Sequence, residues 1–167
     1  MVHRTQLNRQ IAKLTGVSKH TIDRIGVNLN RGGIIRAGGR GRQAPAMGPE
    51  DLKTIILALL GAESTGGVFK TVLKLHGLET GDGRNFGDVI LGICSDAARA
   101  AEVMQISVVR NYPQASIYWK DESGVRIGRI ENFQGDTDKK QPGMRVIATL
   151  NGAVLLDLVK LVLASNG

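Results

Sequence analysis

The stretch from residue 10 to residue 25 constrains the fold more than any other part of this chain. It contains two short apolar patterns with helical spacing, made by Ile11, Ala12, Leu14, Ile22 and Ile25. Gly16 separates them and suits a tight turn, because glycine adopts positive φ without a Cβ clash. Ser18 suits the start of the second helix, since its hydroxyl can accept from the unpaired amides of the first turn. The pattern therefore predicts a helix, a turn and a second helix, which cross steeply over the small Ala12.

This stretch resembles the helix-turn-helix of bacterial and phage DNA-binding proteins, and is especially similar to that of the lactose-repressor family. The family pattern is Ala, three residues, Gly-Val-Ser, two residues, then Thr, an aliphatic residue, any residue and Arg. Here it reads Ala12, Gly16-Val17-Ser18, Thr21-Ile22 and Arg24. The resemblance covers about sixteen residues and implies a DNA-binding module. It does not extend to the sugar-binding domain of that family, and an ordinary helical hairpin in a larger core is the alternative.

The positive charge of the chain is concentrated in the same region. Residues 1–49 hold nine Lys or Arg and one acidic residue, a net charge of +8. Residues 50–167 hold thirteen Lys or Arg and fourteen acidic residues, a net charge of −1. Solubility alone gives no reason for such segregation, so the distribution favours a polyanionic partner for the N-terminal part.

We expect the second helix of the motif to enter the major groove of double-stranded DNA. In the usual docking geometry, Lys19, His20 and Arg24 reach base edges, while Ser18 and Thr21 contact phosphate oxygens. Asp23, on the same helix, either orients Arg24 or accepts from a cytosine amino group. The predicted DNA-binding residues of the helix are thus Ser18, Lys19, His20, Thr21, Asp23 and Arg24.

Residues 30–45 mix arginine with glycine. Ile34 and Ile35 have strand preference and the following glycines permit a turn, so the stretch predicts a short β-hairpin and a winged helix. Arg36, Arg40 and Arg42 would then lie on the wing and contact DNA. The Gly-Arg-Gly-Arg sequence is also similar to the core of minor-groove hooks, with glutamine in place of the usual proline. A flexible Gly/Arg linker is the alternative.

The remaining chain shows helical patterns first, then strand patterns, and a final helical pattern. Helices are expected from Gly48 to Gly61, over 68–75, from Asn85 or Asp88 to about Met104, and over 153–164. Strands are expected over 106–109, 115–119, 125–130 and 144–150. The predicted fold is α+β: a winged helix-turn-helix head (1–60), then an α+β unit (61–167) of helices, a small antiparallel sheet and a C-terminal helix.

No catalytic or metal-binding pattern emerges from the sequence. The three histidines and the single Cys94 lack metal-ligand spacing, so we expect no metal, no cofactor and no enzymatic activity. Cys94 lies in an apolar helical pattern and is predicted to be a small core residue. The absence of a long apolar segment predicts a cytoplasmic protein without a membrane partner.

The function predicted from these observations is sequence-specific binding of double-stranded DNA, by a bacterial or phage transcriptional regulator. One such head rarely suffices, so we expect a homo-oligomer, with a dimer favoured. A phage DNA-packaging recognition protein, such as a terminase small subunit, is the alternative. A third class of function is an enzyme that uses the DNA-binding head to reach its target. The residues leave open whether a protein or small-molecule effector binds the C-terminal unit.

Overall fold

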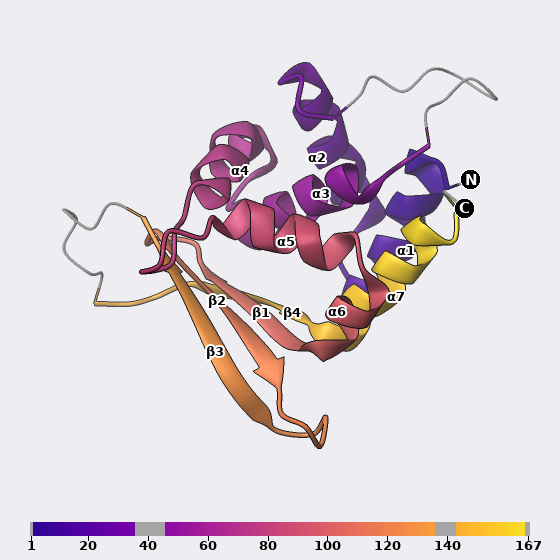
Figure 1. Cartoon of the computed structure of the whole chain (residues 1–167). Helices are drawn as coiled ribbons and strands as arrows, with labels where there is room; N and C mark the ends of the chain where they lie inside the picture. Colours follow the sequence, from indigo (N-terminus) through magenta and orange to yellow (C-terminus); the bar gives the residue numbers. More distant parts are fainter. Residues whose placement is uncertain (1, 36–45, 136–142, 166–167) are drawn as a thin grey trace.

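The computed structural model describes residues 2–35, 46–135 and 143–165 (Figure 1). In chain order, its elements are α1 (Arg4–Thr15), α2 (Lys19–Arg31), α3 (Pro49–Gly61), the 3₁₀ turn η2 (Thr65–Gly67), α4 (Val68–His76), α5 (Phe86–Cys94), α6 (Ala97–Glu102), β1 (Val103–Val109), β2 (Gln114–Lys120), β3 (Ile127–Gln134), β4 (Ile147–Asn151) and α7 (Gly152–Leu163). The fold is α+β, with helices followed by a four-stranded antiparallel sheet of order β3-β2-β1-β4 and a C-terminal helix.

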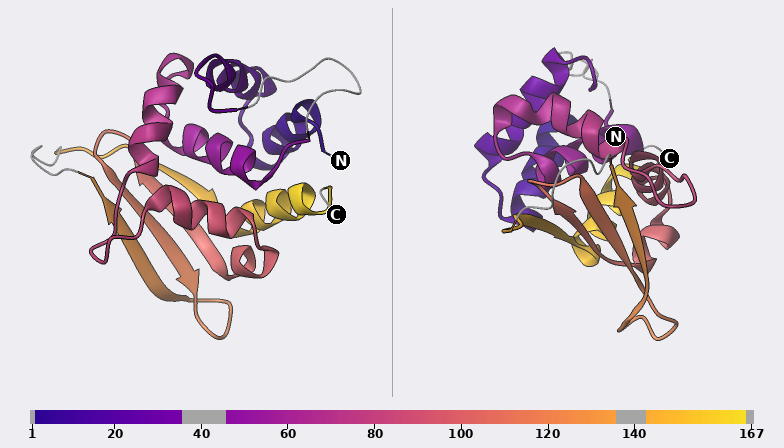
Figure 2. Two further views of the ribbon diagram at one scale, coloured as in Figure 1. Left: turned by 45° about the horizontal axis from the view of Figure 1, so that its top comes forward. Right: turned by 90° about the vertical axis from the view of Figure 1, so that its left-hand side faces the viewer.

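The sheet buries one face against the helices. In the strand register Ile106 lies opposite both Ile117 and Leu150, and all three side chains are buried. Helices α3 and α7 pack over β1 and β4, and the Phe86 ring at the start of α5 lies 4.9 Å from the Phe133 ring of β3. The buried apolar residues form one cluster that extends from Val2 to Val162. The helical layer and the sheet therefore share a hydrophobic core, with α2 on the side away from the sheet (Figures 1 and 2).

Helix α3 is the central helix of this core. Pro49 occupies its first turn, and the Asp51 carboxylate accepts from the backbone N–H of Gly48 at 2.9 Å. Its buried residues cover most of its circumference: Leu52, Thr54, Ile55, Ile56, Leu57, Ala58, Leu60 and Gly61. It contacts α2, α4, α5 and α7 as well as the sheet. Its bounds match those predicted from the proline at its start and the glycine at its end.

One predicted helix is in fact two helices and the start of a strand. The sequence predicts a single helix from Asn85 or Asp88 to about Met104, but α5 ends at Cys94 and α6 begins at Ala97. Asp96 caps α6, because its carboxylate accepts from the backbone N–H groups of Ala98 and Arg99. Met104 itself lies in β1. The alanines continue a helical pattern across this break, so the prediction was wrong about where the helix ends.

The predicted wing is wrong at the two residues of it that the structure describes. Ile34 and Ile35 lie in a bend after α2 and not in a strand, and the Ile35 side chain is 2% exposed within the core. Core packing and not strand pairing accounts for this apolar side chain. The rest of the predicted hairpin, residues 36–45, lies outside the described residues. The N-cap position of α1 is His3.

Two glycines are required where they lie, one by its backbone angle and the other by a close contact. Gly16, between α1 and α2, has φ 72°, as the predicted tight turn requires. At Gly152, where β4 leads into α7, an added Cβ would lie 1.9 Å from the backbone oxygen of Val103. Because Gly152 has no Cβ, α7 can approach β1 closely at this point. The helices of the described part are all too short or too polar to span a membrane.

Candidate nucleic-acid interface

Helices α1 and α2 and the turn between them match the helix, turn and second helix predicted from the sequence. Ser18 is the N-cap of α2, and its hydroxyl accepts from the backbone N–H of Thr21 at 3.1 Å. The Ser18 and Thr21 hydroxyl oxygens also lie 2.8 Å apart and share a hydrogen bond. Each hydroxyl therefore has a local partner at the first turn of α2. One hydroxyl proton of the pair remains available for an outside acceptor such as a phosphate oxygen.

One face of α2 points into the core and the opposite face is open. Its buried residues are Ile22, Ile25, Gly26 and Leu29. The residues of its outward face are exposed: Lys19, His20, Arg24, Val27 and Arg31. Lys19, His20 and Arg24 were predicted from the sequence as DNA-binding residues, whereas Val27 and Arg31 were not. They continue the helical spacing of His20 and Arg24, and that spacing is the signal that could have found them.

Asp23 binds neighbours other than the predicted Arg24. Its carboxylate accepts from the Nζ of Lys19 at 2.5 Å and from the Nδ2 of Asn8 on α1 at 2.9 Å. Partial burial raises the pKa of Asp23, but the hydrogen bonds from Lys19 and Asn8 outweigh it and leave the pKa below its ordinary value. Asp23 thus links α2 to α1 and orients Lys19. We correct the predicted pairing with Arg24 accordingly.

Asn8 links α1 to α2 and was not among the residues predicted from the sequence. It is 2% exposed and lies on α1 one residue from the buried Leu7. Its amide donates to Asp23 across the crossing of the two helices, and the Cβ that Gly26 lacks would lie 3.9 Å from the same amide nitrogen. A polar side chain on the inward face of an amphipathic helix is the signal that could have found it.

The C-terminal half of α2 is held by residues that follow α3. The amide of Asn28 donates to the backbone oxygen of Thr65 at 2.5 Å. A Cβ on Gly32 would lie 2.4 Å from the Phe69 ring, so this ring packs directly on the backbone that ends α2. Residues 65–69 therefore help to orient α2, although they lie outside the predicted head at 1–60.

Three predicted DNA-binding residues lie outside the described residues: Arg36, Arg40 and Arg42. The described members of the predicted set lie at the N-cap and on the first two turns of α2, so the structure brings these residues together: Ser18, Lys19, His20, Thr21, Asp23 and Arg24. Within 2–35, 46–135 and 143–165, no three or more His, Cys, Asp or Glu side chains group as metal ligands. Cys94 is buried as predicted, and burial raises the pKa of its thiol to about 12.

No family model, curated protein or solved structure matches this chain.

Proposed function

We propose that this protein binds double-stranded DNA in a sequence-specific manner through α2 and acts as a transcriptional regulator. The observation that carries the proposal is the outward face of α2. It presents Lys19, His20 and Arg24 from the first two turns of a helix whose other face is buried. Side chains at these positions of a recognition helix reach base edges in the major groove.

The charge of the N-terminal region supports the same proposal. Six of its nine Lys or Arg residues are described, and the only acidic residue of this region, Asp23, is bonded to Lys19 and Asn8. Little negative charge therefore opposes a phosphate backbone here. Binding through such a region loses affinity as salt concentration rises, because the contacts release counterions from DNA.

We propose that the protein acts as a homodimer on a palindromic site. Two copies of α2 related by a two-fold axis would read half-sites about 34 Å apart. Native mass spectrometry measures the number of subunits, and a dimer is the expected result. A ring of eight or more subunits would instead support the DNA-packaging role that the sequence leaves as the alternative.

Selection of bound sites from random double-stranded DNA tests the proposed specificity. We expect one enriched motif, and binding of that motif is then compared between the wild-type protein and two variants. Arg24→Ala is expected to lose about 1–3 kcal/mol, roughly 5- to 150-fold in affinity, and to relax base preference at one position. Arg126→Ala is the matched control, because this exposed arginine lies in the β2–β3 loop on the far side of the molecule from α2 (Figure 1).

Two results would contradict the proposal. One is the absence of any enriched motif, with equal affinity for all duplexes. The other is an equal loss of affinity in the Arg24 and Arg126 variants, which would show that charge alone and not the outward face of α2 governs binding.

A further inference from the structure

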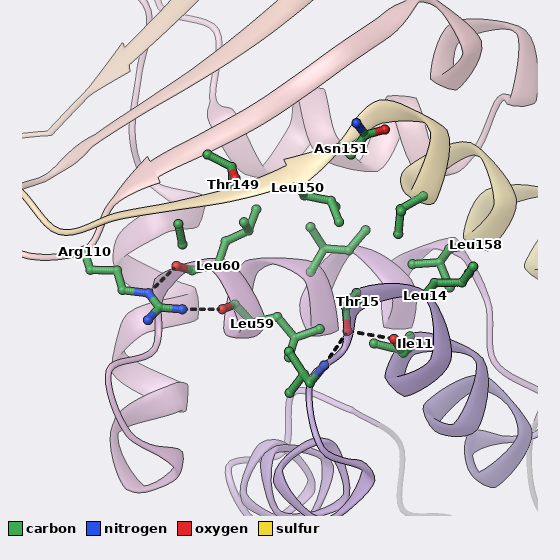
Figure 3. A pocket seen from close by; sticks show the side chains of 14 residues that line it. Ile11, Leu14, Thr15, Leu59, Leu60, Arg110, Thr149, Leu150, Asn151 and Leu158 are labelled. Atoms are coloured by element: carbon green, nitrogen blue, oxygen red, sulfur yellow. Dashed lines mark hydrogen bonds between the residues drawn. The ribbon is translucent and has the colours of Figure 1, made fainter.

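A cavity of about 320 Å³ lies between the helix-turn-helix and the C-terminal part of the chain (Figure 3). One wall comes from α1 and α3, and the other from β4 and α7. Most of its lining is apolar and includes Ile11, Leu14, Leu150 and Leu158. Its volume falls in the range of sites that bind small organic molecules, and such sites combine apolar walls with a few oriented polar groups.

Arg110 lies at one end of this cavity and is held in a fixed orientation. It follows β1 directly, and its guanidinium donates to the backbone oxygens of Leu60 at 2.9 Å and Leu59 at 3.1 Å (Figure 3). These oxygens belong to the last turn of α3, where carbonyl groups lack partners within the helix. The two bonds use the Nε and Nη2 atoms, and Nη1 makes no hydrogen bond to the described part of the chain.

The charge of Arg110 has no counter-ion in the described part of the chain. No described carboxylate lies within 4 Å of its guanidinium, and none lines the cavity. Glu63 lines an adjoining cleft with Arg110, but Lys74 lines that cleft too. The carbonyl dipoles of α3 supply only partial negative charge. A half-buried guanidinium in this setting favours an anion, and a carboxylate matches its planar geometry.

We propose that this cavity is a binding site for a small carboxylic acid with an apolar body. The carboxylate lies against Arg110 and the apolar body lies among Ile11, Leu14, Leu150 and Leu158. The hydroxyl of Thr15, also in the lining, already donates to Ile11 and accepts from Val17, so the guanidinium provides the charge recognition. Free carboxylic acids are therefore preferred over the matching neutral amides.

The cavity also touches the turn that leads into α2. Thr15 ends α1, Val17 lies in the turn, and both line the cavity. A bound molecule therefore contacts the connection that sets the position of α2. The binding site itself does not depend on the proposed DNA binding, and it is tested on the protein without DNA.

The test is a titration of the ¹⁵N-labelled full chain followed by NMR, with 3-phenylpropanoate and 3-phenylpropanamide as the two probes. The acid is expected to shift the amide signals of Thr15, Val17 and Thr149 saturably and to bind at least tenfold more tightly than the amide. Arg110→Gln is expected to abolish this preference, whereas Arg110→Lys keeps part of it because the positive charge remains.

A second pair of variants tests the location without changing Arg110. Val154→Trp places a large ring in the cavity and is expected to weaken binding of both probes at least tenfold. Val125→Trp is the matched control, because Val125 is 76% exposed, lies in the β2–β3 loop and is outside the cavity lining. Equal affinity of the wild-type protein for acid and amide would overturn the proposal. Saturable shifts confined to residues elsewhere, or no saturable binding of the acid, would overturn it equally.

Discussion

Helices α2 and α3 have the same length of thirteen residues but very different surroundings. Eight residues of α3 are buried, compared with four of α2. The remaining face of α2 is exposed and carries Lys19, His20 and Arg24. The difference separates two roles: α3 contributes more buried apolar area to folding, and α2 carries the exposed face that we propose contacts DNA. Substitutions on the outward face of α2 should therefore change binding while leaving stability nearly constant.

The two helices also differ in what fixes their orientation. Apolar contacts from four helices and the sheet surround α3. Polar bonds hold α2 at two points, from Asn8 to Asp23 and from Asn28 to the Thr65 backbone. Hydrogen bonds have strict distance and angle requirements, whereas apolar packing is less directional. The polar links therefore add directional constraints on α2 to the apolar packing of its buried face.

The largest expected effect is on stability, from a truncation in α3. Leu57 is fully buried, so Leu57→Ala should lower the free energy of unfolding by about 2–5 kcal/mol through lost burial and the cavity left behind. Val27 on α2 is 41% exposed, and Val27→Ala should change the free energy of unfolding by less than about 0.5 kcal/mol. Urea denaturation of both variants measures these values. Similar losses of stability in the two variants would contradict the inference that α3 contributes more to folding than the outward face of α2.

The second expected effect concerns DNA contacts beyond α2. If Arg40 and Arg42 contact phosphates as the sequence predicts, replacing both with alanine should weaken binding to all sequences. The slope of log affinity against log salt concentration should fall in magnitude by roughly one to two units. Fluorescence anisotropy at several salt concentrations measures this slope. An unchanged slope would mean that Arg40 and Arg42 do not contact DNA.

Most helices could be predicted because their ends carry local signals. Ser18 at the start of α2, and Pro49 and Gly61 at the ends of α3, mark boundaries that the structure reproduces within a residue. The alternation of apolar residues likewise predicted four strands and a terminal helix, although the strand ends differ by up to four residues. Local hydrogen bonding and periodic burial determine these features, so the sequence alone is sufficient for them.

Features that depend on distant contacts could not be predicted in the same way. The strand preference of Ile35 suggested a wing, but this side chain packs into the core. One miss was local: the alanines around Ala97 suggested a continuous helix, although Asp96 is an N-cap residue that starts a new helix there. Arg110 is separated from Leu60 by fifty residues, so nothing in the local sequence indicates that it lies at the end of α3. The outward residues of α2 were accessible to prediction because helical spacing alone selects them.

The smallest expected effect tests the polar link that orients α2. The hydrogen bonds from Lys19 and Asn8 lower the pKa of Asp23, so its carboxylate stabilises the folded state above the unfolded pKa of about 4. This contribution is lost as the pH falls through the still lower folded pKa. Because the Asp23 side chain is 41% exposed, solvent screens the pair, and Asp23→Asn should cost only about 0.5–1 kcal/mol at pH 7.

Urea denaturation between pH 2 and pH 7 checks this expectation. The difference between the wild-type protein and Asp23→Asn should be constant near neutral pH, shrink below about pH 4 and be smaller in high salt. Asp157→Asn is the matched control, since Asp157 is exposed on α7 and forms no ion pair within 4 Å in the described part of the chain. A difference that grows as the pH falls would mean that the Asp23 carboxylate opposes folding. In that case apolar contacts, as in α3, would hold α2 in place.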